Sequence, residues 1–499
     1  MPANAKFQKA AEALQQGDSN PFEQLVKGTV KPRGDAELSA VKQAVQTLAE
    51  KALEGVALIP GDAIKTIKSI IAEIDAKLSE QINLIIHHPE FQALESTWRG
   101  IRHLVFNTET DTMLKIRVLN VSKKDAAKEL KRFPGTAWDQ SSLFKKIYGA
   151  EYDVLGGSPY GCLVGDYHID NTPEDIGFLS DMAKIAAAAH APFLCAADPG
   201  MVRMESWQEL SQPRDLAKIF DSPAHAQWAA FRKQEDAAYV ALTMPRFLGR
   251  LPYGTKAKNP LEEFAFEEDT DGKDHSKFLW SNSAFAMAAN ITRSFKEYGW
   301  CTRIRGVESG GTVSELPCYT FPTDDGSTDM KCPTEIAIGD RRGAELDKLG
   351  FIPLYHRKGT TDATFIGAQS VFQPGKYFDP DAEANSNLTA RLYYLFPVCR
   401  FAHYLKVMVR DKIGSFKERS DMESWLNNWI SNYVLLNPDA GEEAKAQKPL
   451  AAAEVKVQEI PGNPGYYAAQ FWLRPHYQLE GLNVSLRLTS KLPSAKAGG

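Results

Sequence analysis

The most regular hydrophobic pattern lies near the C-terminus, where apolar and polar residues alternate along two stretches. The apolar positions are Tyr467, Ala469, Phe471 and Leu473 in the first stretch, and Leu482, Val484, Leu486 and Leu488 in the second. Alternation with a period of two predicts strands that each bury one face. Pro475 has no N–H to give to a neighbouring strand, so it should end the first strand. Val455 and Val457 predict a weaker strand ahead of the Pro- and Gly-rich break at 461–465.

These terminal strands need partners, because an isolated hairpin is marginally stable in water. One possibility is that the body of this chain supplies the strands that complete the sheet, since termini are often tied into their own domain. The other is that a second chain supplies them by strand addition. The alternation itself fits both, and the choice decides whether the protein is self-contained or a building block.

The N-terminal region is predicted to be helical. Asn20-Pro21-Phe22-Glu23 reads as a helix start, with Asn as the N-cap, Pro at the first helical position and Glu closing a capping box. Phe22, Leu25 and Val26 then fall on one face. A helix this short is unstable alone, so its apolar face should pack either on its own domain or in a partner's groove.

Two longer helices should follow, with apolar residues at intervals of three and four, and similar spacing continues after Pro89. The stripes are Leu38, Val41, Val45, Leu48 and Ala52; Ile64, Ile67, Ile71, Ile74, Leu78 and Ile85; and Phe91, Leu94, Trp98, Ile101 and Val105. Asp62 should cap the second helix. This seam is too short for a long coiled coil and fits helices packed in pairs, within the chain or with a partner's helix.

The middle of the chain alternates short apolar runs with helical patterns, which favours an α/β layer. Predicted strands lie at 114–118, 162–164, 193–195, 336–338 and 351–354, with one or two more in the loop-rich stretch 306–332. Predicted helices begin at Ser122 by the capping-box rule and cover 175–189, most of 213–241, 283–298 and 340–349. Farther on we expect a long helical run at 382–413 kinked near Pro397, a helix at 421–436 and a polar linker at 437–449.

Composition places the chain among ordinary soluble globular proteins. It has 499 residues, 43% hydrophobic and 24% charged, with a formal net charge of −5, and this slightly acidic balance argues against nucleic acid or an anionic membrane as partner. The start lacks the apolar core of a signal peptide, and the run 185–197 is too short to span a bilayer. The six cysteines are scattered without a CxxC pair, as expected for reduced thiols in a cytoplasmic protein.

A search for catalytic chemistry gives little. The sequence has no phosphate-binding loop of the Walker type, no HExxH and no GxGxxG. The stretch 156–161 misses the nucleophile-elbow spacing by one place and favours a turn, and 340–342 beside Glu345 favours a surface ion-pair cluster over an anion site. His87-His88 with Glu90 matches no zinc spacing. We therefore predict no catalytic, cofactor-binding or metal-binding residue.

One helix carries a concentration of basic residues. Arg400, Lys406, Arg410 and Lys412 are interleaved with apolar side chains. They could form a basic face for a negatively charged surface or the solvated face of an amphipathic helix, and the pattern supports both readings equally.

Eleven segments in order along the chain are similar to the large sheath subunit of the bacterial type VI secretion system, the TssC/VipB family, which is related to contractile phage tail sheaths. The segments are His87–Phe91, Trp98–Gly100, Gly165–Tyr167, Pro245–Gly254, Tyr298–Cys301, Arg305–Glu308, Pro333–Glu335, Asp340–Arg342, Leu349–Leu354, Arg400–Lys406 and Arg410–Gly414. They spread over most of the chain, which makes the resemblance more specific than any single motif.

The resemblance implies a structural protein that is not an enzyme and needs no cofactor. Its partners would be a small sheath subunit (TssB/VipA-like), neighbouring sheath heterodimers, inner-tube hexamers and a hexameric AAA+ unfoldase (ClpV-like). It also implies an α+β, mixed α/β architecture: an N-terminal helical region at 1–60 that contacts the unfoldase and the small subunit, a central α/β sheath domain at 61–380, and an inner-layer domain at 381–499 with C-terminal helices and strands shared between subunits.

Site residues follow from the same resemblance. Phe22, Leu25 and Val26 match the unfoldase-binding helix by position and pattern. The inter-subunit strands would use Phe471, Leu473, Leu482, Val484, Leu486 and Leu488. We add the hypothesis that Arg400, Lys406, Arg410 and Lys412 face the lumen and contact the inner tube. The rival readings are a phage-type homopolymeric tail sheath and an α/β enzyme whose active site lacks a recognisable motif.

Overall fold

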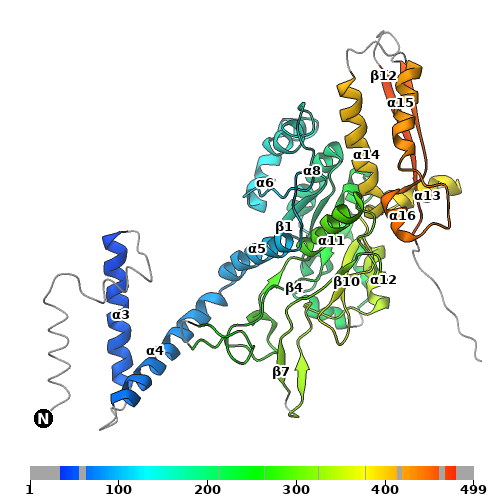
Figure 1. Cartoon of the computed structure of the whole chain (residues 1–499). Helices are drawn as coiled ribbons and strands as arrows, with labels where there is room; N and C mark the ends of the chain where they lie inside the picture. The colour runs from blue at the N-terminus through cyan, green and yellow to red at the C-terminus, as the bar shows by residue number, and fades with distance from the viewer. Residues whose placement is uncertain are drawn as a thin grey trace, which may run out of the picture. The chain divides into compact units, whose positions relative to one another are not determined.

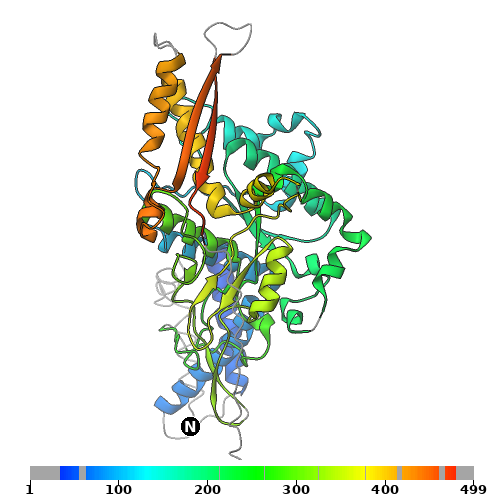
Figure 2. The same ribbon diagram turned by 90° about the vertical axis from the view of Figure 1, so that its right-hand side faces the viewer.

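The structure, a computed structural model, describes residues 34–55, 63–212, 214–262, 265–323, 325–376, 378–412, 419–459 and 467–478 (Figures 1 and 2). Its described residues form two compact units. One draws on Met1–Ser96, Arg250–Leu279 and Pro317–Lys331, and the other on Thr97–Gly249, Trp280–Leu316 and Cys332–Gly499. The expected mixed α/β fold is confirmed. The helix predicted at 21–30, the cap at Asp62 and the strand at 482–488 lie outside the described residues.

The first unit is built on long helices. α3 (Asp35–Gly55) and α4 (Ala63–Ile86) confirm the two longer helices, and the apolar spacing that continues after Pro89 belongs to α5 (Pro89–Phe106), whose first turns lie in this unit. A loop region with the 3-10 turn η7 (His275–Lys277) and the hairpin of β7 (Thr320–Pro322) and β8 (Thr328–Met330) complete the described part of this unit. The buried Arg250 guanidinium bonds Glu95 and Glu268, each at 2.7 Å, and so ties the loop to α5.

The second unit contains a six-stranded sheet with the order β1-β2-β3-β9-β10-β6. The first four strands are parallel, and β10 and β6 are antiparallel to their neighbours. The strands are β1 (Leu163–Ile169), β2 (Phe193–Ala197), β3 (Val240–Met244), β9 (Phe351–His356), β10 (Ala363–Phe365) and β6 (Thr312–Val313). β2 and β3 are buried at every position, as expected for parallel strands covered on both faces.

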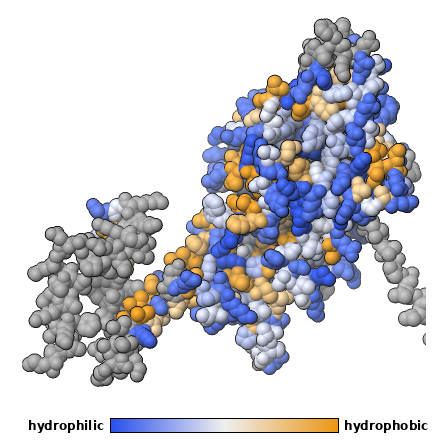
Figure 3. Space-filling model, in the orientation of Figure 1, coloured by the Kyte–Doolittle hydropathy of each residue, from blue (hydrophilic) through white to orange (hydrophobic). Residues whose placement is uncertain are grey.

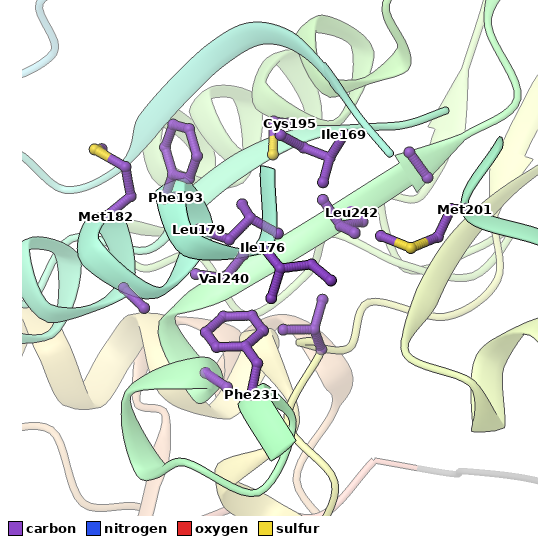
Figure 4. Close-up of a cluster of buried hydrophobic side chains, with 14 of the residues drawn as sticks. Ile169, Ile176, Leu179, Met182, Phe193, Cys195, Met201, Phe231, Val240 and Leu242 are labelled. Carbon is purple, nitrogen blue, oxygen red and sulfur yellow. The ribbon is translucent and has the colours of Figure 1, made fainter. Parts of the chain in front are cut away.

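Helices cover both faces of this sheet. On one face α8 (Pro173–Ala189), capped by Thr172, packs Leu179 against Val240 and Leu242 (Figure 4). The other face of the sheet carries Ala241 of β3 and Ile352 of β9. These residues pack against α11 (Ser283–Tyr298) and the first half of α14 (Leu392–Asp411). The helices predicted at 175–189 and 283–298 are thereby confirmed.

Short elements fill the connections of the second unit. They are α6 (Lys123–Leu130), η1 (Ala137–Gln140), α7 (Ser142–Phe144), η2 (Lys145–Gly149), η3 (Pro199–Val202), η4 (Trp207–Ser211), α9 (Leu216–Phe220), η5 (Pro223–His225), α10 (Ala226–Phe231), η6 (Glu235–Tyr239), β4 (Phe247–Leu248), β5 (Trp280–Ser281) and α12 (Asp340–Lys348). Ser122 caps α6 by accepting the Asp125 N–H, as predicted. The ion pair of Arg342 and Glu345 at 2.7 Å confirms the surface cluster expected there.

Several predicted elements are corrected by the structure. No ladder forms at 114–118 or 336–338 among the described residues. The helical pattern at 213–241 is divided into short turns, and its last residues belong to β3. The large apolar residues of 213–241 are buried in the core of the sheet and α8, so burial and not helical periodicity explains their composition.

The long helical run at 382–413 is two helices, α13 (Pro380–Thr389) and α14. The break falls at Arg391, whose backbone bridges Gln369 and whose guanidinium donates to the Gln369 side chain at 2.8 Å. Pro397 lies inside α14. The polar linker expected at 437–449 contains the helix α16 (Glu442–Gln447), where Ala446 is buried.

Candidate assembly surfaces

The C-terminal strands form a layer of their own beside α14 and α15 (Arg419–Ser431), as Figure 2 shows. β11 (Leu450–Glu459) and β12 (Tyr467–Pro475) form a two-stranded sheet among the described residues, and the first residue of β11, Leu450, also forms a bridge with Val434. The strands predicted at 455–457 and 467–474 are therefore confirmed, and Pro475 ends β12 as expected. The described body of the chain does not take this hairpin into its six-stranded sheet.

α15 closes the outer edge of β11. Asn427 accepts the Val455 N–H at 2.9 Å and donates its amide to the Val455 carbonyl at 2.7 Å, in the manner of a neighbouring strand. Glu423 accepts the Val457 N–H at 2.8 Å. These side chains occupy the backbone groups that another strand would need, so β11 is protected against edge pairing.

The register fixes which groups β12 leaves open. Because Val455 and Val457 turn their backbone groups toward α15, they form non-hydrogen-bonded pairs with Phe471 and Ala469. Phe471 and Ala469 therefore point their own N–H and C=O groups away from β11, and so does Leu473. No described residue pairs with this edge, which makes it the open edge of the layer.

The two predicted strand residues that the structure describes lie on this edge strand. Phe471 is 40% exposed and Leu473 is half-buried, and both sit on the face that packs toward α15. Trp472 on the opposite face is 53% exposed. The other predicted strand residues, Leu482, Val484, Leu486 and Leu488, lie outside the described residues, as do Phe22, Leu25 and Val26 of the predicted unfoldase helix.

α14 joins this layer to the sheet. Its first half lies in the core on the α11 face of the sheet, and its second half packs with α15 and the hairpin. At the crossover, Phe401 stacks on Trp300 with ring centroids 4.1 Å apart. His403 is buried and bonds the Ala189 carbonyl at 2.8 Å; burial lowers its pKa to about 4 despite that bond.

The four basic residues of α14 are engaged with the chain itself. Lys406 contacts the Asp153 carboxylate at 3.3 Å and lies 3.9 Å from the Tyr152 ring centroid. Arg410 donates to the Val154 carbonyl at 3.1 Å. The structure thus brings Lys406 and Arg410 together over one loop.

The other two basic residues point elsewhere. Arg400 lies over the rings of Tyr404 and Phe295, 4.8 and 5.7 Å from their centroids. Lys412 lies 5.2 Å from the Trp425 ring centroid. The four side chains consequently do not share one face of α14.

Sequence reasoning missed the residues that shape this layer. Asn427 and Glu423 carry no motif, and only their four-residue spacing on one helix face would have singled them out. The aromatic cluster of Tyr148, Tyr152 and His190 around His403 gave no signal at all, because it is assembled from three separate segments.

The described residues hold no set of three or more His, Cys, Asp or Glu arranged to bind a metal ion. A helix of the length and apolarity needed to cross a bilayer is also not found among them. A small cavity of about 30 Å³ lies where the chain leaves β12, lined by Thr302, Tyr394 and Gln478 among others. It has room for about one water molecule and not for a substrate.

Comparison with known proteins identifies the class of this fold. Residues 68–372 match the VipB family model described as EvpB/VC_A0108, tail sheath N-terminal domain, and residues 381–492 match the companion tail sheath gpW/gp25-like domain. The molecule is thus a tail sheath protein. Its sequence is 62% identical over 493 residues to the type VI secretion system sheath protein TssC1 of Pseudomonas aeruginosa, covering 98% of this chain and 99% of the relative. The chain belongs to the TssC/VipB family of type VI secretion sheath subunits, which are structural proteins and not enzymes.

Two solved structures also show a likeness. One is the baseplate of the anti-feeding prophage, with 11% identity, a TM-score of 0.36 and coverage of 76% of this chain and 84% of that one. The other is the contracted helical sheath of the same prophage, with 12% identity, a TM-score of 0.28 and coverage of 63% and 67%.

Proposed function

We propose that this chain is the large subunit of a cytoplasmic contractile sheath. It pairs with a small sheath subunit of the TssB/VipA type, and the heterodimers stack as a helical tube around inner-tube hexamers. Contraction of that lattice drives the inner tube outward, without nucleotide hydrolysis by the sheath. The observation that carries the proposal is the identity with a sheath protein over nearly the whole chain.

The open edge of β12 supports a physical mechanism for linking subunits. Its backbone groups at Ala469, Phe471 and Leu473 are available for strand addition, while the β11 edge is already occupied by Asn427 and Glu423. A neighbour's strand that pairs with β12 would satisfy those groups and extend the sheet. The exposed edge, which is an aggregation hazard in a monomer, becomes the linking element of the tube.

The domain plan of the sequence remains part of this proposal. The region 1–60 would contact the small subunit and the unfoldase, 61–380 would form the central sheath domain, and 381–499 would form the inner layer. A ClpV-like AAA+ unfoldase would grip the helix at 21–30 through Phe22, Leu25 and Val26 and recycle contracted sheath. Support for that step is the pattern of the sequence alone.

Co-expression with and without the small subunit, followed by negative-stain microscopy, tests the assembly. Tubes only with the small subunit are expected. Tubes formed by this chain alone would instead identify a phage-type homopolymer. Val484→Asp or Leu486→Asp should leave a soluble heterodimer that does not polymerise, because a charge on the buried face of an added strand is not tolerated. Normal tubes from both variants would remove that strand from the mechanism.

We further propose that Lys406 and Arg410 contact the inner tube. Charge reversal at Lys406 tests this contact and needs a charge-swap control. Reversing Lys406 also breaks its contact with Asp153, so a loss of sheath growth has two explanations. In the double variant Lys406→Asp, Asp153→Lys the ion pair is restored with its polarity inverted. We expect growth on the tube to stay impaired in the double variant; recovery would show that Lys406 only holds the loop in place.

A further inference from the structure

The second unit has an apolar surface that no described part of the chain covers. Six large apolar side chains between Trp98 and Leu119 are exposed, to the extent of 66% for Trp98, 42% for Val105, 77% for Phe106, 63% for Met113, 66% for Val118 and 52% for Leu119. Figure 3 shows hydrophobic residues, in orange, gathered along α5. Soluble monomers seldom leave apolar patches of this kind in water, and such patches mark interaction sites.

The exposure is not caused by a loosely attached helix. α5 rests on α11 through Gly100, where an added Cβ would overlap the Phe285 ring. Leu104 is buried in the same contact. Trp98 is two residues from Gly100, and successive helical residues are about 100° apart, so Trp98 points to the opposite side. α5 therefore buries the face that carries Gly100 and Leu104, and it presents the large apolar residue Trp98 outward.

The segment that follows α5 has the side-chain pattern of a strand without a ladder. Exposed and half-buried residues alternate from Met113 to Arg117, with Leu114 and Ile116 turned inward. Ile116 packs beside Val164 of β1. No backbone hydrogen bond is found for residues 115–120 with any described residue. A segment with strand periodicity that pairs with no strand among the described residues points to a partner strand in another chain.

Contacts at both ends hold this segment in place. Asp111 accepts the N–H groups of Met113 and Leu114 at 2.7 and 2.8 Å and pairs with Lys296 at 2.7 Å. At the other end, Tyr167 donates to the Val121 carbonyl at 2.9 Å. The segment between these contacts is therefore held in place while its backbone groups remain unpaired among the described residues.

A groove runs between α5 and this segment. It is lined by Val105, Thr110, Asp111, Leu114, Lys115, Ile116 and Val118 and has a volume of about 440 Å³. That is the volume of several apolar side chains, which a strand lying along the segment would insert from one of its faces. The groove and the unpaired backbone lie on the same residues, so one occupant would satisfy both.

We infer that residues 113–119, with Trp98 and Val105 of α5, are the docking site for an extended strand of the small sheath subunit. The inference rests on the proposed heterodimer. The small subunit fits better than a neighbouring copy, because a surface this apolar requires a partner that stays bound before, during and after polymerisation. Neighbouring copies are joined only within the tube, and the open β12 edge already serves that contact.

Capture by the tagged small subunit tests the surface. Trp98→Asp and Val118→Lys, each in the full-length chain, should reduce capture at least tenfold, and circular dichroism checks that each variant is folded. Leu436→Asp is the control, since Leu436 is a highly exposed apolar residue of the same unit that lies outside α5, residues 113–119 and β12; it should be captured like the unsubstituted chain. Undiminished capture of both surface variants would overturn the site while leaving the heterodimer intact. If the unsubstituted chain is not captured, the proposed function itself fails.

Hydrogen exchange on the purified heterodimer tests the kind of occupant. Amides 115–119 have no backbone acceptor among the described residues, so protection that is present in the heterodimer and absent from the free chain comes from the small subunit. A strand paired on one side protects alternate amides, and we expect at least 100-fold slower exchange at every second position. Uniformly fast exchange of these amides would rule out a strand as the occupant. This conclusion would hold even if Trp98→Asp abolished capture by the small subunit.

Discussion

Asn427→Ala tests whether α15 closes the edge of β11. Asn427 makes two hydrogen bonds with Val455, one to each of its backbone groups, at 2.7 and 2.9 Å. Alanine removes both without disturbing α15, because it is the best helix former. The variant isolates the role of the amide from the role of the helix.

The magnitude follows from those two bonds. Each net hydrogen bond contributes about 1 kcal/mol, so two contribute about 2 kcal/mol. Replacing Asn by Ala in a helix returns about 0.5 kcal/mol of propensity. The net loss of about 1.5 kcal/mol in the local opening free energy corresponds to roughly tenfold faster exchange of the Val455 amide.

Hydrogen exchange resolved to single amides on the heterodimer measures this effect. Asn428→Ala is the matched control, since Asn428 is the next residue of the same helix and is exposed. The Val457 amide is an internal control, because its acceptor is Glu423 and not Asn427. We expect acceleration at Val455 in the Asn427 variant only.

Equal exchange at Val455 in the two alanine variants would refute the idea that this side chain seals the strand. If the seal is real, its loss exposes a second edge on the hairpin. Heterodimers of the Asn427 variant should then associate through β11 and give short irregular aggregates alongside tubes, whereas the Asn428 variant should give tubes alone.

Three further predictions concern the second unit. Gly100→Ala should lower stability by about 1–3 kcal/mol, because the methyl group overlaps the Phe285 ring; an unchanged Tm would contradict the packing, and Phe285→Leu should restore part of the loss. Burial lowers the pKa of His403 to about 4, below its unfolded value, so its contribution, up to about 3 kcal/mol, is present above pH 6.5 and is lost as the pH falls toward 4. His403→Phe should flatten the dependence of the urea midpoint between pH 7 and 5, and an equally steep dependence would exclude this group. Burial raises the pKa of the Cys332 thiol, but hydrogen bonds with His356 and Thr334 outweigh it and leave the pKa below its ordinary value; iodoacetamide at pH 7.5 should label Cys332 ahead of the buried thiols, and His356→Phe should remove that preference.

Hydrophobic periodicity in the sequence predicted several of the helices and strands. β12 shows its alternation directly in the sequence, and α8 and α11 lie where helical spacing and caps place them. In α8 the buried residues recur at helical spacing along one face, so the periodicity of the sequence matches the periodicity of the fold.

Long-range contacts explain where the sequence was insufficient. The break at Arg391 depends on Gln369, which is 22 residues away, and nothing in the helical pattern marks it. The strand pattern at 114–118 was recognised, but the absence of a ladder depends on what lies beside it in space. The basic residues of α14 suggested a surface, whereas Lys406 and Arg410 are held by the loop around Asp153.

The two edges of the hairpin also determine what kind of polymer this chain could form. If two open β12 edges paired with each other about a twofold axis, the result would be a closed dimer, and growth would stop. Continued growth requires that the edge of one subunit accept a different segment of the next, which makes the contact heterologous and directional. Asn427 closes the edge of β11 and β12 stays open, so each subunit offers one strand edge for this contact. The second part of the requirement is a different segment that pairs with that edge. The alternating stretch at Leu482–Leu488 is the segment whose sequence suits this second part, and a heterologous contact of this kind extends as an open helix when the rotation between successive subunits does not close.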